Sequence, residues 1–162
     1  MSAVRFKPLV AAALSATLLT GVVVAPAPAG VPGSPSAINM DARGVALGGY
    51  DPVAYFDGGE PTPGVDTISA SYEGARYLFA SEAHRKTFLA NPRKYIPEFG
   101  GFCAVGASFG EKADIDPKTG KVVNGKLYVN NSAKVQNIFD KDTSAIITRA
   151  EANWSSVKDK PL

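Results

Sequence analysis

Two side chains with versatile chemistry occur once each in this chain, the imidazole of His84 and the thiol of Cys103. Both groups can bind transition metals, and together they can form the base and nucleophile of an enzyme. They lie in one stretch, residues 71–104, between aromatic-rich segments that a folded chain must bury. Any chemistry is therefore expected in this stretch first.

His84 is predicted to lie on a helix over Glu82–Ala90. Ser81 has the residue type of an N-cap, and Asn91-Pro92 ends the helix because a residue before proline avoids the α region. His84 precedes Phe88 by four residues, so the two share a helix face. Two interpretations stay open: a solvated histidine at the edge of the core, or a metal ligand or base that works with Cys103.

A single cysteine excludes an internal disulfide, and Cys103 also has two interpretations. It can be a small buried residue of the glycine-rich segment 100–110, since unpaired cysteines are often buried. It can instead be a reactive thiol or a metal ligand. If Gly100 and Gly101 open a helix, Cys103 lies in the first turn, where the helix dipole favours the thiolate.

The surrounding pattern predicts two similar units, each a β-hairpin followed by a helix. A Tyr, a Ser and a Phe follow Gly74 at the same spacings as they follow Gly125. Asn124-Gly125 is a strong hairpin signal, and the apolar residues of 143–154 lie on one helical face. We therefore predict a small single α+β domain with two β-hairpin–helix units and a helical C-terminus.

The first 29 residues are typical of a secretory signal peptide, with two basic residues, an apolar run and a small-residue cleavage site. The run is shorter than the roughly 20 residues of a membrane span. We expect an exported protein, periplasmic or secreted, with a flexible linker at 30–43, a domain at 44–156, a tail at 157–162 and no membrane span after signal removal.

Charge argues against nucleic acid as a partner. Without the two basic residues of the signal peptide, 15 of the 17 basic residues remain, against 15 acidic residues. The remaining chain has no net charge and no basic cluster with interleaved aromatic residues.

Five blocks occur in an order that resembles the exported branch of the YHS-domain proteins: GYDPVAYF, YEGARYLFASEAHRKTFLANPRKY, GGFCA, NGKLYVN and a C-terminal Asn153-Trp154. The resemblance covers residues 44–156. It implies a small α+β domain linked with metal binding.

The chain departs from the metal-linked form of that pattern, in which three cysteines would be ligands. Ala54 and Ala80 replace two of them, and His84 occupies the third position. A closed structural zinc site is excluded, because it needs four ligands and the chain has one cysteine and one histidine. An open site of His84, Cys103 and a carboxylate from Asp51 or Glu82 would suit copper or zinc.

We therefore expect a small, non-enzymatic binding module that holds a transition metal near His84 and Cys103. No recognised protease signature surrounds Cys103. Two alternatives stay open: a thiol redox protein that acts through Cys103 alone, and an interaction domain in which Cys103 is buried.

Overall fold

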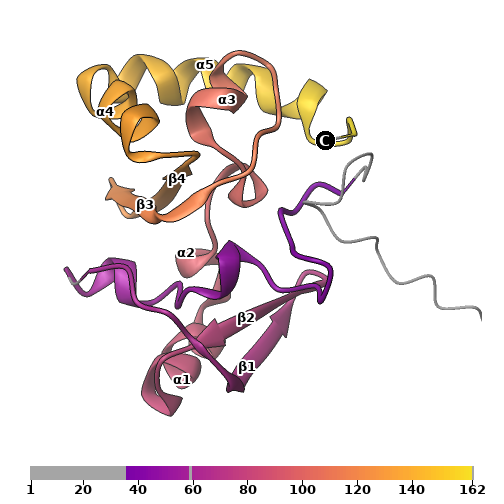
Figure 1. Cartoon of the computed structure of the whole chain (residues 1–162), viewed down its shortest axis with the longest axis vertical. Coiled ribbons are helices and arrows are strands. Elements are labelled where there is room, and N and C mark those ends of the chain that lie inside the picture. Colours follow the sequence, from indigo (N-terminus) through magenta and orange to yellow (C-terminus); the bar gives the residue numbers. More distant parts are fainter. Residues whose placement is uncertain (1–35, 59, 162) are drawn as a thin grey trace, which may run out of the picture.

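The computed structural model describes residues 36–58 and 60–161, and it shows the two predicted hairpin–helix units at opposite ends of the molecule (Figure 1). The predicted signal peptide, and the linker before residue 36, lie outside the described residues. The elements in chain order are η1 (Leu47–Gly49), η2 (Ala54–Phe56), β1 (Val65–Tyr72), β2 (Ala75–Phe79), α1 (Glu82–Ala90), α2 (Pro92–Tyr95), η3 (Phe99–Gly101), α3 (Ala104–Ser108), β3 (Asp116–Val123), β4 (Lys126–Asn130), α4 (Ala133–Lys141) and α5 (Thr143–Val157).

The first unit contains β1, β2 and α1, and the second contains β3, β4 and α4. Each strand pair is an antiparallel hairpin with an irregularity in the register near its open end. Both turns have two residues with positive φ, at Glu73-Gly74 and at Asn124-Gly125. This is the conformation of the hairpin turns that match the twist of the strands. The α+β class and both units are thereby confirmed.

The likeness between the units extends upstream to a short turn that the sequence pattern did not reveal. Leu47, Gly48 and Gly49 have φ values of 56°, 59° and 78°, and Phe99, Gly100 and Gly101 have 52°, 59° and 78°. Positive φ is unfavourable for a residue with a side chain, so the same strained turn at both places indicates an internal structural repeat. Asp51 follows the first turn at the position that Cys103 holds after the second.

The predicted helices are confirmed. Helix α1 covers Glu82–Ala90, and the side chain of Ser81 accepts a hydrogen bond from the backbone N–H of His84. In α5, Ile146 and Ala150 are buried and Trp154 packs against the same cluster, as the spacing indicated. The helix runs to Val157, which is buried, so the packed domain extends one residue into the predicted tail.

Each unit has its own apolar cluster, and a third cluster joins them. Phe79 and Phe88 lie in the first cluster, and Phe139 lies in the second. The third contains Leu47 and Tyr55 from the first half of the chain, with Leu127 and Val129 from β4.

The ring of Tyr55 crosses between the halves of the molecule over Gly120, where a Cβ atom would overlap it. The Tyr55 hydroxyl donates to the carbonyl oxygen of Pro117 at 2.6 Å. The packing requires glycine at position 120, because the aromatic ring occupies the space of a side chain there.

The flexible linker predicted for residues 30–43 is wrong for its last part. Asn39 and Met40 are 6% and 3% exposed, and the N–H of Asn39 donates to the carbonyl oxygen of Gly100 at 2.8 Å. The packed domain therefore begins before residue 44. No helix among residues 36–58 and 60–161 is long and apolar enough to cross a membrane.

Candidate functional site

Asp51 is a buried carboxylate at the start of the candidate site. Its oxygens accept hydrogen bonds from the backbone N–H groups of Val53, at 2.9 Å, and Ala80, at 2.8 Å. The side chain has no solvent-exposed surface. A buried carboxylate needs such partners, because the loss of hydration is costly. Asp51 thereby ties the turn after η1 to the end of β2.

Helix α1 brings His84 to the same carboxylate. The Nδ1 atom of His84 lies 2.6 Å from Oδ2 of Asp51, 33 positions earlier in the sequence. An ionised carboxylate only accepts hydrogen bonds, so Nδ1 is the donor of this contact when Asp51 is ionised. Since the same oxygen also accepts from Ala80, the ring is held in one orientation.

A second carboxylate lies at the other nitrogen of the ring. Nε2 of His84 is 3.2 Å from Oδ2 of Asp57, whose side chain is 59% exposed. The imidazole is therefore placed between a fully buried carboxylate and one that faces solvent. The His84 side chain itself is 27% exposed, on the solvent side of the pair.

The arrangement has the geometry of an ion pair, and it also fits a histidine whose Nε2 ligates a metal. Histidines that ligate metals commonly donate the other ring N–H to a carboxylate, which fixes the tautomer and makes the free nitrogen more basic. Two ligand atoms about 2.0–2.1 Å from one zinc or copper ion lie about 2.9–3.4 Å apart at bond angles of about 90–110°. The 3.2 Å between Nε2 of His84 and Oδ2 of Asp57 falls in this range.

The structure does not bring Cys103 to His84. Cys103 is the N-cap of α3, so it precedes the helix rather than lying in the first turn. Figure 1 shows α3 and α1 near opposite ends of the molecule. The Cys–His pair considered from the sequence is therefore not formed, and Cys103 cannot share an ion with His84 in this structure.

Cys103 is instead part of a buried polar contact in the second unit. It is 2% exposed, its thiol lies 3.6 Å from Oδ1 of Asn130, and Sγ accepts from the N–H of Gly106 at 3.4 Å. Asn130 also accepts from the N–H of Val105 and donates to Gln136 at 2.8 Å. Every polar atom in this contact has a structural partner, which fits the interpretation of Cys103 as a buried residue.

Glu82, the other carboxylate considered as a ligand, pairs with Arg85 on the surface of α1 at 2.9 Å. Within the described part of the chain, no three His, Cys, Asp or Glu side chains are grouped so that they could hold a metal ion. Two candidate donors, Nε2 of His84 and the carboxylate of Asp57, lie together at this place.

Asp57 and Asn130 are the polar residues that the sequence pattern missed. Asp57 follows the apolar turn Ala54–Phe56, and no motif marks it as a partner of His84. The internal repeat offers a partial signal for Asn130, because it ends β4 where Phe79 ends β2. An amide in place of a buried phenylalanine indicates a polar interaction below the hairpin.

Comparison of the chain with family models, with curated proteins and with solved structures finds no match. The resemblance to YHS-domain proteins therefore remains a prediction.

Proposed function

We propose that this protein is a small exported binding module, without enzymatic activity, that holds a zinc or copper ion through Nε2 of His84 and the carboxylate of Asp57. The single observation that supports the proposal is the ring of His84 between two carboxylates, 2.6 Å from Asp51 and 3.2 Å from Asp57. Imidazole and carboxylate donors suit Zn(II) and Cu(II). Asp51 would orient the ligand rather than contact the ion.

The remaining positions around the ion would be filled by water or by a donor from a partner protein. An open metal site of this kind can release or transfer an ion more readily than a closed site with four protein ligands, because fewer bonds must be broken. The export pattern of residues 1–29 supports a role outside the cytoplasm. Without the two basic residues of the predicted signal peptide the chain has no net charge, which argues against nucleic acid as the partner.

The thiol redox alternative has less support than the metal site. A redox cysteine must be accessible as a thiolate, and Cys103 is 2% exposed. The burial of Cys103 is compatible with the other alternative, an interaction domain. An interaction domain would not bind a metal ion at His84, so a metal titration separates it from the proposed metal-binding module.

The test is an isothermal titration of the untagged full chain with Zn(II) and with Cu(II), compared with three variants. We expect His84→Ala to abolish binding, and Asp57→Asn to weaken it by at least about 10-fold, since even the loss of an outer-shell partner costs about 10- to 100-fold in metal affinity. Cys103→Ala is the matched control and should bind as the wild type does. Undiminished affinity in folded His84→Ala would refute the proposal.

A further inference from the structure

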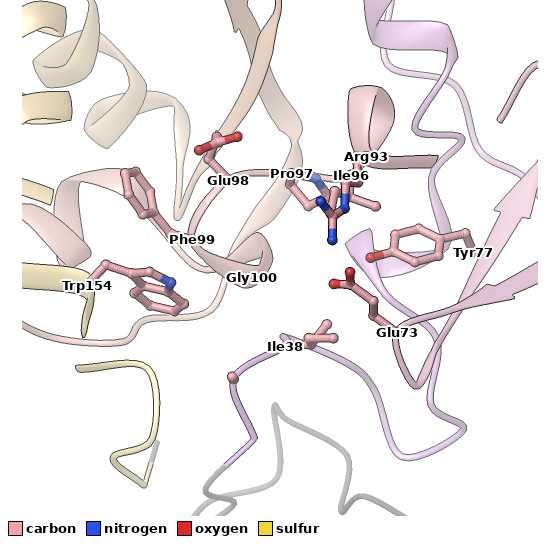
Figure 2. A pocket seen from close by; sticks show the side chains of 11 residues that line it. Ile38, Glu73, Tyr77, Arg93, Ile96, Pro97, Glu98, Phe99, Gly100 and Trp154 are labelled. Carbon is pink, nitrogen blue, oxygen red and sulfur yellow. The ribbon is translucent and has the colours of Figure 1, made fainter. Parts of the chain in front are cut away.

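A pocket of about 540 Å³, widely open to solvent, lies between the two halves of the molecule. It is within the usual size range of small-molecule sites, about 300–1,000 Å³. Figure 2 shows side chains from both halves around it, among them Glu73 and Tyr77 from the first hairpin, Arg93 from α2, Phe99 from η3 and Trp154 from α5.

One wall of the cavity is built by the N-terminal segment of the described chain. Ala37 and Ile38 line the cavity and cross η3 at Gly100, where a Cβ atom would overlap the carbonyl oxygen of Ala37. The N–H of Asn39 fixes the crossing by donating to the carbonyl oxygen of Gly100 at 2.8 Å. The wall is therefore part of the packed structure.

Three polar groups of the pocket lie together at one end, whereas Glu98, which also lines it, pairs with Lys126 at 3.3 Å. In Figure 2 the guanidinium of Arg93, the carboxylate of Glu73 and the hydroxyl of Tyr77 point toward one another. Nε of Arg93 donates to the hydroxyl of Tyr72 at 3.3 Å, which orients the guanidinium and leaves its terminal nitrogens available. Within the described chain, neither Arg93 nor Glu73 has an ion-pair partner. The hydrogen bond to Tyr72 is the main cause of the raised pKa of Arg93, and the nearby charge of Glu73 acts in the same direction.

Tyr77 adds a neutral hydroxyl to this end. Burial raises the pKa of Tyr77, and the nearby charge of Glu73 acts in the same direction. The phenol therefore stays protonated at neutral pH and can donate or accept a hydrogen bond.

Two aromatic rings, with Glu98 beside them, line the opposite end of the pocket. Trp154 is partly exposed, and its ring packs against Phe99 with 5.8 Å between centroids and 63° between planes. Figure 2 places these two rings across the cavity from Arg93 and Glu73. A flat apolar group in the cavity would contact the indole.

From this division we propose that the cavity binds a free aromatic α-amino acid. Its carboxylate would bind the terminal nitrogens of Arg93, its ammonium would bind Glu73, and its side chain would contact Trp154. Arginine and carboxylate form paired hydrogen bonds in this way, and a guanidinium beside a carboxylate offers a partner to each charge of a zwitterion. A peptide's C-terminal residue shares the carboxylate but has no free ammonium, so it would satisfy only one of the two charges.

The experiment uses L-phenylalanine as the probe and Trp154 as the reporter. Trp154 is the only tryptophan of the chain, and phenylalanine does not absorb at the red edge of the tryptophan band. We expect a saturable change in Trp154 fluorescence. N-acetyl-L-phenylalanine and L-phenylalaninamide each lack one charge and should bind about 10- to 100-fold more weakly, the scale of a lost charged hydrogen bond.

Two variants test the charged end without disturbing the core. Arg93→Gln and Glu73→Gln change exposed side chains, and each should weaken L-phenylalanine binding about 10- to 100-fold. Arg85→Gln, on the outer surface of α1, is the matched control and should bind as the wild type does.

Three results would overturn the proposal. One is no saturable response of the wild type to L-phenylalanine. Another is equal binding of N-acetyl-L-phenylalanine, which would assign the cavity to aromatic carboxylates or peptide C-termini. The third is wild-type affinity in both Arg93→Gln and Glu73→Gln.

Discussion

Nδ1 of His84 lies 2.6 Å from the fully buried Oδ2 of Asp51, although the two residues come from different elements of the first unit. The contact joins α1 to the turn that follows the strained Leu47–Gly49 segment. It also directs Nε2 of the only imidazole in the chain toward Asp57 and solvent. One buried carboxylate therefore supports both the packing of the unit and the candidate site.

Asp51→Asn should destabilise the fold by at least about 2 kcal/mol. The amide nitrogen that replaces Oδ2 is a donor, and it would face the N–H of Ala80 and Nδ1 of His84. A buried donor that loses its acceptor costs about 1–3 kcal/mol. The measurement is the free energy of unfolding in urea.

Asp57→Asn is the control for that measurement. It also replaces an aspartate next to His84 by asparagine, but the side chain of Asp57 is exposed. We expect a change within about 0.5 kcal/mol, as is usual at a surface position. Equal effects of the two substitutions would contradict the structural role of Asp51.

The thiol of Cys103 should be protected from maleimide in the native protein. It is 2% exposed and lies beneath the contact with Asn130, so labelling requires the second unit to open. We expect slow labelling in buffer and complete labelling in denaturant, followed by mass spectrometry. Rapid stoichiometric labelling of the native chain would instead revive the redox alternative.

Stability should fall at high pH because of buried tyrosines. Burial raises the pKa of Tyr77 and of Tyr55 above the ordinary value. Above the unfolded value of about 10, the unfolded chain releases these protons while the folded chain retains them. The unfolded state then binds fewer protons, so the free energy of unfolding decreases as pH rises, by up to about 1.4 kcal/mol per pH unit for each tyrosine.

Tyr77→Phe checks this pH dependence with little change in shape. Above about pH 10, the free energy of unfolding of this variant should decline less steeply than that of the wild type. Near neutral pH, the free energies of unfolding of the two proteins should depend on pH in the same way. Identical slopes for the two proteins at high pH would show that Tyr77 is not protected from ionisation.

Gly100→Ala should be among the most damaging small substitutions. Position 100 has a φ of +59°, and the added Cβ would overlap the carbonyl oxygen of Ala37. Gly110→Ala is the matched control, since Gly110 has a φ of +80° but open space around it. Alanine at positive φ costs about 1–2 kcal/mol at both positions. A larger loss of stability in Gly100→Ala than in Gly110→Ala, measured by thermal unfolding, is therefore due to the overlap with Ala37. Equal losses would contradict the packing of Ala37 on η3.

Local signals predicted most of the fold. Asn124-Gly125 indicated a hairpin turn and Ser81 a helix start, because these residues act on the backbone within a few positions. The spacings after Gly74 and Gly125 indicated the two units for the same reason. The matching turns at Leu47–Gly49 and Phe99–Gly101 were missed, since Leu47 and Phe99 are not residue types that usually adopt positive φ.

The candidate site was predictable only in part, because it depends on how distant elements pack. Asp51 and His84 were both candidates, and the structure joins them. The grouping of Cys103 with His84 relied on their nearness in the sequence. The chain leaves the first unit after α1, so Cys103, which precedes α3, lies in the other half of the molecule. Asp57 has no sequence signal, since an exposed aspartate after a turn is common.

The central claim is that Nε2 of His84 binds a metal ion while Nδ1 stays hydrogen-bonded to Asp51. The most direct measurement is ¹H–¹⁵N NMR of the imidazole during addition of Zn(II) to the untagged full chain, in which His84 is the only histidine. The account predicts a protonated Nδ1 throughout and a shift of the Nε2 resonance that Asp57→Asn weakens. Imidazole resonances that do not respond to Zn(II), or a metal bond at Nδ1, would contradict it.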